Sequence, residues 1–315
     1  MPATAPLIEL VGLYRDYGPL RAVAGVDLRL ERGEVLGLLG PNGAGKSSTM
    51  QMLAGTLAPS AGGVRIDGVD LLEQPRQAKR RLGYLPEQPP IYPDMTVSEY
   101  LHFAAALHGV ARAERDAAVQ RAVARCGLTG VEPRLLGHLS KGYQQRAGIA
   151  QAIVHDPAAV VLDEPTVGLD PIQIREIRAL IAELGREHGV VLSTHILPEV
   201  QAVCSRVAIM HQGHIVFSEP MATLDASAPA DSFLVTLARA PALAQIEALE
   251  AVRAAEAAES RIRVWPAAES GGIERVTEQF VAAGWGLTEL IPERRSLEQI
   301  FVDMTAQDAP TAEAA

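Results

Sequence analysis

The chain has 315 residues, of which 48% are hydrophobic and 21% charged, and its formal net charge is −10. This length and composition suit one large folded domain, alone or with a smaller one, and argue against an intrinsically disordered chain. The acidic balance argues against a broad nucleic-acid-binding surface, which needs clustered lysine and arginine. No signal peptide is visible and the apolar runs are far too short to span a bilayer, so we expect a soluble protein.

Short apolar runs alternate with longer helical patterns from the N-terminus to about residue 220. The runs predicted as strands are 7–14, 23–30, 34–39, 64–66, 82–85, 160–163, 190–193 and 207–210. The predicted helices are 46–55, 97–108, 113–126, 142–155 and 172–188. Buried strands that alternate with helices predict an α/β fold with a mainly parallel sheet covered on its faces. The nearly all-helical stretch at about 90–155 is interpreted as a helical insert in this core.

The composition changes near Met221, and a segment rich in Ala, Ser and Pro at 225–231 is predicted to be a linker. The domain before it is expected to cover 1–224, and a small C-terminal α+β domain is expected to cover 232–305. The elements predicted for the small domain are a strand at 232–237, a helix at 241–249, two strands that meet near Glu259, a helix at 273–283, a strand at 286–291 and a helix at 297–304. The first six fit a split βαββαβ arrangement. Residues 306–315 are expected to form a disordered tail.

A glycine-rich segment follows the predicted strand 34–39 and opens the predicted helix 46–55. Its spacing fits a phosphate-binding loop, which predicts a P-loop NTPase core. The glycines let backbone N–H groups converge on phosphates, and the helix N-terminus adds the positive end of its dipole. Lys46 is expected to reach the β- and γ-phosphates of ATP, and Ser47 to bind Mg²⁺. The predicted ATP-binding residues of this segment are Gly40, Pro41, Asn42, Gly43, Ala44, Gly45, Lys46, Ser47 and Ser48.

Two acids, Asp163 and Glu164, end the apolar run at 160–163. They would lie at the carboxyl end of a parallel strand, where open α/β sheets bind their ligands. Asp163 is predicted to hold Mg²⁺, directly or through water, and Glu164 to orient and deprotonate the attacking water. An acidic turn that only caps the strand is the alternative, and the phosphate loop earlier in the chain makes it the weaker one.

The segment Leu139-Ser140-Lys141-Gly142-Tyr143-Gln144-Gln145-Arg146 resembles the signature motif of the ATP-binding cassette (ABC) ATPase family. Physically it is a second anion site, made of a hydroxyl, a glycine and a helix N-terminus. Two phosphate-seeking surfaces on one chain suggest that two copies enclose the nucleotide between them. The resemblance implies that Ser140, Lys141 and Gly142 approach the ATP of the other protomer. An ordinary helix start with Ser140 as N-cap is the alternative.

Other positions match the family pattern in the same order, and the resemblance extends from Leu7 to about Pro220. It implies that Tyr17 stacks on adenine, that Asp170 belongs to a loop at the dimer contact, and that His195 senses the γ-phosphate. A core tyrosine and a structural histidine are the alternatives for Tyr17 and His195.

The sequence departs from the family pattern at two places. The glutamine of the loop that links the nucleotide to the helical insert is replaced by Glu87, with Gln88 one place later, so either residue is a candidate for that role. In the signature, Lys141 and Tyr143 stand where glycine and glutamine are commoner.

The resemblance implies an ATPase subunit that uses ATP and Mg²⁺, pairs with itself or a homologue, and drives an integral-membrane permease from the cytoplasmic face of the membrane. The C-terminal segment 296–305 is similar to the tail of subunits that serve export-type permeases, including the multidrug and gliding-motility groups. An amphipathic helix that packs on its own domain is the alternative for that segment. Two other functions remain open: a soluble cassette ATPase acting on nucleic acid or the ribosome, and a nucleotide-gated subunit that has lost hydrolysis. A single phosphate loop and the acidic charge argue against the first, so no nucleic-acid partner is expected, and Glu164 and His195 argue against the second.

Overall fold

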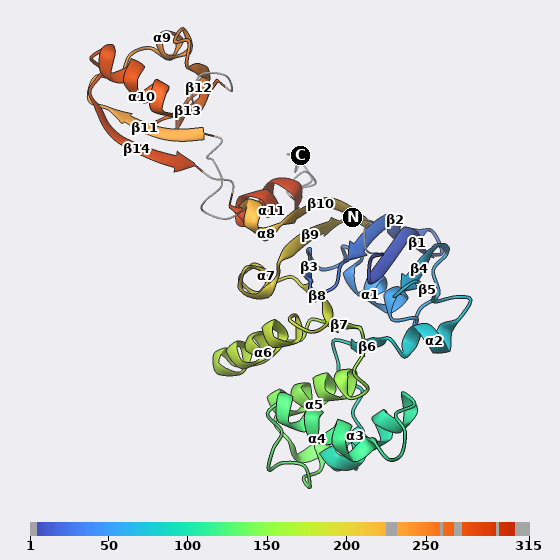
Figure 1. Cartoon of the computed structure of the whole chain (residues 1–315). Helices are drawn as coiled ribbons and strands as arrows, with labels where there is room; N and C mark the ends of the chain where they lie inside the picture. Colours follow the sequence, from blue (N-terminus) through green and yellow to red (C-terminus); the bar gives the residue numbers. More distant parts are fainter. Residues whose placement is uncertain (1–4, 225–231, 259–260, 268–272, 294–295, 306–315) are drawn as a thin grey trace, which may run out of the picture. The chain divides into compact units, whose positions relative to one another are not determined.

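The computed structural model describes residues 5–224, 232–258, 261–267, 273–293 and 296–305. They divide into two compact units (Figure 1). The core unit runs to Met221 and takes in 303–305, and the C-terminal unit is Ala222–Val302. The predicted linker, 225–231, and the predicted disordered tail, 306–315, lie outside the described residues.

The centre of the core unit is a six-stranded sheet with the order β10-β9-β3-β8-β7-β6. Its strands are β3 (Val35–Leu39), β6 (Leu82–Leu85), β7 (Ala159–Asp163), β8 (Gly189–Thr194), β9 (Arg206–His211) and β10 (His214–Pro220). All pairings are parallel except that of β10 with β9. Every residue of β3, β7 and β8 is buried, as expected for parallel strands that helices cover on both sides (Figure 1). The predicted α/β fold with a mainly parallel sheet is confirmed.

A second, antiparallel sheet has the order β2-β1-β4-β5. Its strands are β1 (Ile8–Tyr17), β2 (Leu20–Leu30), β4 (Ala61–Ile66) and β5 (Val69–Asp70). The sequence predicted β1, β2 and β4 as strands, but it did not separate them from the parallel sheet. Tyr17 pairs with Leu20 across a two-residue turn, and so short a connection joins only antiparallel neighbours.

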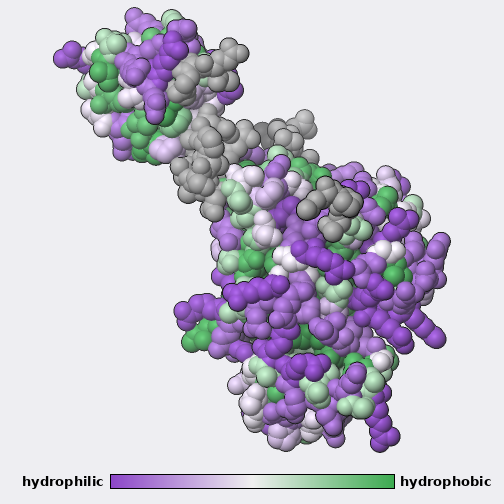
Figure 2. Space-filling view, viewed as in Figure 1, coloured by the Kyte–Doolittle hydropathy of each residue, from purple (hydrophilic) through white to green (hydrophobic). Residues whose placement is uncertain are grey.

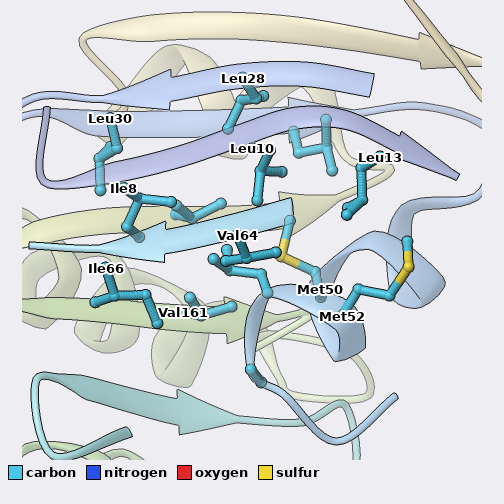
Figure 3. Packing of buried hydrophobic residues seen from close by; sticks show 14 of the residues in the cluster. Ile8, Leu10, Leu13, Leu28, Leu30, Met50, Met52, Val64, Ile66 and Val161 are labelled. Carbon is cyan, nitrogen blue, oxygen red and sulfur yellow. The ribbon is translucent and has the colours of Figure 1, made fainter. Parts of the chain in front are cut away.

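A hydrophobic cluster fills the space between the antiparallel sheet, helix α1 (Lys46–Leu53) and the central sheet (Figure 3). Ile8 and Leu10 point into it from alternate positions of β1, Met50 and Met52 enter from α1, and Val161 enters from β7. All five side chains are at most 2% exposed. This packing fixes α1 against both sheets, and with it the glycine-rich segment that precedes the helix.

Local capping signals decide where two of the core helices begin. Helix α3 (Val97–Leu107) starts at a capping box between Thr96 and Glu99. Helix α6 (Pro171–Leu184) starts at Asp170, whose carboxylate accepts two backbone N–H groups. The other helices of this part of the chain are α2 (Pro75–Lys79), α4 (Arg115–Arg125), the 3₁₀ turn η1 (Leu136–His138), α5 (Lys141–Ile153), α7 (Leu197–Val203) and α8 (Met221–Leu224). The predicted helical insert comprises α3, α4, η1 and α5.

The C-terminal unit contains a four-stranded antiparallel sheet with the order β12-β13-β11-β14. Its elements are β11 (Ser232–Leu237), α9 (Leu243–Glu247), β12 (Val252–Ala258), β13 (Arg261–Pro266), α10 (Ile273–Ala282) and β14 (Leu287–Glu293), followed by α11 (Leu297–Thr305). The first six occur in the βαββαβ order that the sequence predicted. Val235 and Val264 of the sheet pack with Ile246 of α9 and Phe280 of α10 in a separate hydrophobic cluster.

The visible surface of the core unit is mainly hydrophilic, with hydrophobic side chains interspersed over the helical insert at the bottom of the view (Figure 2). Within the described ranges, every helix is too short or too polar to cross a bilayer.

A stacked histidine pair lies where the helical insert returns to the central sheet. The rings of His108, at the end of α3, and His155, just before β7, are 3.7 Å apart between centroids and nearly parallel. His155 Nε2 donates to the Leu82 carbonyl at 3.2 Å, and Nδ1 has no hydrogen-bond partner among the described residues. Burial, reinforced by His108 and His188, lowers the pKa of His155 to about 3.

We expect His155 to make the folded protein acid-sensitive. In the unfolded chain its pKa is about 6.5, so below that pH the unfolded state binds more protons than the folded state. Stability is therefore lost as pH falls from 6.5 towards 3, by about 2 kcal/mol at pH 5. Urea unfolding at pH 7.5 and 5.0 should show that His155→Gln removes most of this loss, because an amide can still donate to Leu82. The exposed His214→Gln is the control; an unchanged pH dependence in His155→Gln would refute the assignment.

Candidate nucleotide-binding site

A cavity of about 600 Å³ in the core unit brings together predicted residues from five separate segments. This volume is in the range of small-molecule sites. The predicted residues that line it are Tyr17, Asn42, Gly43, Gly45, Lys46, Ser47, Ser48, Glu87, Glu164 and His195. The glycine-rich segment, Glu164 and His195 all follow the carboxyl ends of β3, β7 and β8, which are neighbours in the sheet.

The glycine-rich segment passes closely between other parts of the core. Gly45 has φ 105°, and a Cβ there would collide with the Ala22 carbonyl. A Cβ at Gly40 would likewise collide with the Met210 carbonyl. Asn42 and Gly43 remain exposed and line the cavity. These contacts explain why glycines stand at 40 and 45, and they leave the loop in a form suited to phosphate oxygens.

Lys46 folds back over the segment that precedes it. Its Nζ donates to the carbonyls of Gly40 at 2.7 Å and Pro41 at 3.2 Å, and the residue is 6% exposed. Glu164 Oε1 lies 3.8 Å from Nζ. Burial lowers the pKa of Lys46, while Glu164, Asp163 and Glu87 oppose that shift by favouring the charged form. The ammonium group is therefore a poorly hydrated cation, suited to an anionic ligand.

Asp163 is the last residue of β7 and is 2% exposed. Its Oδ1 is buried without a hydrogen-bond partner in the described part of the chain. Burial raises the pKa of Asp163, against the effect of the nearby Ser193 and Ser47 hydroxyls. An unpaired buried carboxylate oxygen beside a serine hydroxyl fits Mg²⁺, which prefers oxygen ligands. No group of three or more His, Cys, Asp or Glu among the described residues could hold a metal by itself, so a magnesium ion here would also need phosphate oxygens and water.

Glu164 and His195 are in direct contact. His195 Nδ1 lies 3.0 Å from both carboxylate oxygens of Glu164, and the Glu164 N–H donates to the Ser193 carbonyl at 2.9 Å. The backbone of Glu164 has φ 48°, a region that non-glycine residues rarely adopt. Such strain is kept at functional sites when the surroundings over-determine it. The sequence predicted both residues but gave no sign that their side chains touch.

Tyr17 lies at the rim of the cavity and is 42% exposed. Its hydroxyl is 3.5 Å from Ser48 Oγ, so the end of β1 meets the first turn of α1. The Arg15 guanidinium lies over the Tyr17 ring, 4.5 Å from its centroid. The sequence did not predict this role of Arg15, although an arginine two residues away on a strand faces the same side.

The predicted signature residues do not line the cavity. Ser140 is the exposed N-cap residue of α5, but its side chain makes no capping hydrogen bond among the described residues. The Lys141 ammonium packs against Gly168, and Gly142 lies against the end of the Gln173 side chain. The N-terminus of α5 is thus held against the loop before α6, while the Ser140 hydroxyl is not used for capping.

Asp170 and Gln88 also lie outside the cavity lining. Asp170 Oδ1 accepts the N–H groups of Ile172 and Gln173, both at 2.9 Å, and so caps α6. Glu87 and Gln88 are both exposed, and of the two it is Glu87 that lines the cavity. Three predicted residues of the glycine-rich segment do not line the cavity: Gly40, Pro41 and Ala44, of which Ala44 is 3% exposed.

Comparison with known proteins identifies the family of the core unit. The family described as ABC transporter matches residues 23–167. The chain is 39% identical over 207 residues to the ABC transporter ATP-binding protein NatA of Bacillus subtilis, covering 65% of this chain and 84% of NatA. It is 35% identical to the bacitracin transport ATP-binding protein BcrA of Bacillus licheniformis, over 68% of this chain and 70% of BcrA. A solved structure of the ATP-binding subunit of an ABC transporter matches with a TM-score of 0.63 and 30% identity, over 69% of this chain and 91% of that one.

In the segment after β6, the cavity lining favours Glu87 over Gln88 as the residue that acts on the bound nucleotide. Because Glu87 faces the cavity and its charge acts on Lys46 and Asp163, we expect Glu87→Ala to lower kcat for ATP hydrolysis about tenfold. Gln88→Ala should stay within about twofold of the unchanged protein. Steady-state ATP hydrolysis by the two variants, purified side by side, measures this. The reverse order of effects would assign the role to Gln88.

Proposed function

The chain belongs to the ATP-binding cassette family of transporter ATPases, and from this premise we propose how its residues bind ATP, hydrolyse it and drive a separate membrane permease. Membership of the family makes it the ATP-binding and ATP-hydrolysing subunit of a transporter. The observation that carries the residue assignments is that Lys46, Glu164 and His195 meet in one cavity, at the ends of adjacent parallel strands.

The phosphate chain of ATP is proposed to lie along the segment 40–48, with Lys46 at the β- and γ-phosphates. An incoming phosphate oxygen can replace the carbonyl oxygens of Gly40 and Pro41 as acceptor for the Lys46 ammonium. Mg²⁺, held by Ser47 and Asp163, would neutralise phosphate charge during the reaction. Tyr17, backed by Arg15, is proposed to stack on adenine at the rim.

Glu164 is proposed to accept the proton of the water that attacks the γ-phosphate. Its carboxylate is buried but faces the cavity, which gives it reach to a water at that position. His195 donates its Nδ1 proton to this carboxylate and is 44% exposed, so the rest of its ring is available to the γ-phosphate. His195 would thereby orient Glu164 when the γ-phosphate is present.

Two copies of the chain, or one copy and a homologue, are proposed to close around two ATP molecules. The signature residues Ser140, Lys141 and Gly142 lie outside the cavity, at the start of α5, where backbone N–H groups and the helix dipole favour an anion. The Ser140 hydroxyl is available for the γ-phosphate on a facing protomer. Asp170 would bring its loop to the same contact.

Glu164→Gln should separate ATP binding from hydrolysis. The amide has the shape of the carboxylate but cannot accept the proton, so we expect hydrolysis to fall at least about 100-fold. The variant should still bind ATP and accumulate as an ATP-dependent dimer in size-exclusion chromatography with light scattering. Glu183→Gln, at an exposed ion pair with Arg125, is the matched control. Hydrolysis at the unchanged rate would show that Glu164 is not the base.

The permease is proposed to dock on the helical insert, where hydrophobic side chains are exposed (Figure 2). Tyr92 is 52%, Phe103 42% and Leu107 73% exposed, and the rings of Tyr92 and Phe103 pack edge to face at 5.7 Å. Exposed apolar side chains that gather in this way commonly mark a protein contact. We place the subunit at the cytoplasmic face of the membrane through this permease. The names of BcrA and of a probable multidrug ATP-binding protein, YbhF of Escherichia coli, and the segment 296–305 support export as the direction.

Purification of the tagged chain from membranes of its own cells, with ATP and Mg²⁺ present, tests this partner. We expect an integral-membrane protein in stoichiometric amount. Phe103→Ser should reduce its recovery at least about threefold because a contact side chain is lost. Leu72→Ser, at another exposed hydrophobic residue 57% exposed, should not. Recovery only from the soluble fraction, with ribosomes or nucleic acid, would keep the ATPase chemistry but overturn the transport assignment.

A further inference from the structure

Glu199 is a buried carboxylate behind the cavity, in the first turn of α7, and the roles assigned above do not use it. It is 1% exposed. One carboxylate oxygen accepts a hydrogen bond from Thr166 Oγ1, and the other accepts one from Thr194 Oγ1 at 2.8 Å. Arg178 Nη2 of α6 lies 3.9 Å from the first oxygen. Glu199 therefore links α7 to the segment after β7, to α6 and to the end of β8.

The two threonines belong to the segments that carry the proposed reacting groups. Thr166 follows Glu164 by two residues, and Thr194 directly precedes His195. Thr166 is 2% exposed and Thr194 is fully buried. The Thr194 hydroxyl also accepts the Ile196 N–H at 3.1 Å, so it holds the chain on both sides of His195. The position of each segment thus depends on the same carboxylate.

Burying the Glu199 carboxylate costs free energy, and an apolar side chain would fill the same space without that cost. Its nearest cation, Arg178, is at the outer limit of an ion pair, and Arg178 Nε is buried without a partner in the described part of the chain. When a buried ion pair as a whole is replaced by apolar side chains, the change is often neutral or even stabilising, so stability alone does not call for this distant pair. What the carboxylate offers instead is two acceptors, one for each threonine, at a fixed separation.

The two hydrogen bonds to Glu199 restrain the segments whose side chains, Glu164 and His195, are in contact. Glu164 has φ 48°, and a backbone in this region is kept only where its surroundings over-determine it. On the cavity side the two residues meet through His195 Nδ1 at 3.0 Å from both carboxylate oxygens. Behind them, the bonds from Glu199 to Thr166 and Thr194 tie the same two segments together. The cavity contact and the buried bonds form a closed ring through Glu164, Thr166, Glu199, Thr194 and His195.

We propose that Glu199 is a positioning residue that holds the Glu164 and His195 segments in register through Thr166 and Thr194. This inference rests on the roles proposed for Glu164 and His195. Glu199 does not touch the cavity, so it acts on the rate of hydrolysis and leaves the affinity of the phosphate loop for ATP unchanged.

The test compares steady-state ATP hydrolysis by Glu199→Ala, Glu199→Gln, Thr166→Val and Thr194→Val. We expect Glu199→Ala to lower kcat at least about tenfold with the KM for ATP within about threefold. Glu199→Gln keeps an acceptor and a polar end for the threonines, and should recover part of the rate. The two valine variants keep the side-chain shape, lose the hydroxyl, and should each lower kcat about three- to tenfold.

Combined variants distinguish positioning from simple destabilisation. Because Glu199 acts through the Glu164–His195 contact, Glu199→Ala should add less than about twofold to the loss already caused by His195→Ala. Glu34→Ala, which breaks a part-buried ion pair with Arg206 away from the cavity lining, is the control for lost stability. It should lower the melting temperature without lowering kcat at 25 °C.

Three results would overturn the proposal: an unchanged kcat in folded Glu199→Ala, a KM that rises as much as kcat falls, or losses that multiply independently with His195→Ala. If Glu199→Ala does not fold, Thr166→Val and Thr194→Val in the His195→Ala background decide in the same way. Full hydrolysis by Glu164→Gln or His195→Ala would instead refute the proposed function of those residues.

Discussion

The register of three parallel strands is the constraint on which the rest of the site depends. β3 pairs with β8 through Leu39 and Thr194, and β8 pairs with β7 through Ser193 and Asp163. The three strands therefore end at one level, and the residues that follow them meet at one edge of the sheet. A slip of one residue in either pairing would turn every side chain of that strand to the other face.

The sheet edge also sets the electrostatics of the cavity. Lys46, Asp163 and Glu164 are all less than 10% exposed, so their charges are poorly screened by water and act strongly on one another. The opposite directions of the pKa shifts, lowered for Lys46 and raised for Asp163, both come first from burial. The phosphates and Mg²⁺ of the proposed nucleotide complex would supply charges of both signs that such a site lacks, which connects the packing of the core to the proposed binding of ATP.

A hydrophobic cluster and a set of buried hydrogen bonds, both outside the cavity, hold the segments that line it. The hydrophobic cluster between α1 and the two sheets holds the phosphate loop from one side, as Met50 and Val161 illustrate (Figure 3). The polar ring around Glu199 holds the Glu164 and His195 segments from the other. The signature residues at the start of α5 do not line the cavity of their own chain. We therefore propose that they act on the nucleotide of a second copy.

Sequence patterns alone predicted the α/β class, which the structure confirms, and they singled out the glycine-rich segment around Lys46 and the acids that end β7, because each depends on local spacing and on neighbours along the chain. They also predicted the six-element order of the C-terminal unit. They did not predict the separate antiparallel sheet, the edge strand β10 or the short helices α2, α7 and α8, since an exposed edge or a single helical turn leaves little periodic signal. Nor did they place Glu87 rather than Gln88 at the cavity, bring His195 against Glu164, or identify Glu199. Those contacts join residues from different strands and loops, and only the register and twist of the folded sheet decide which of them meet.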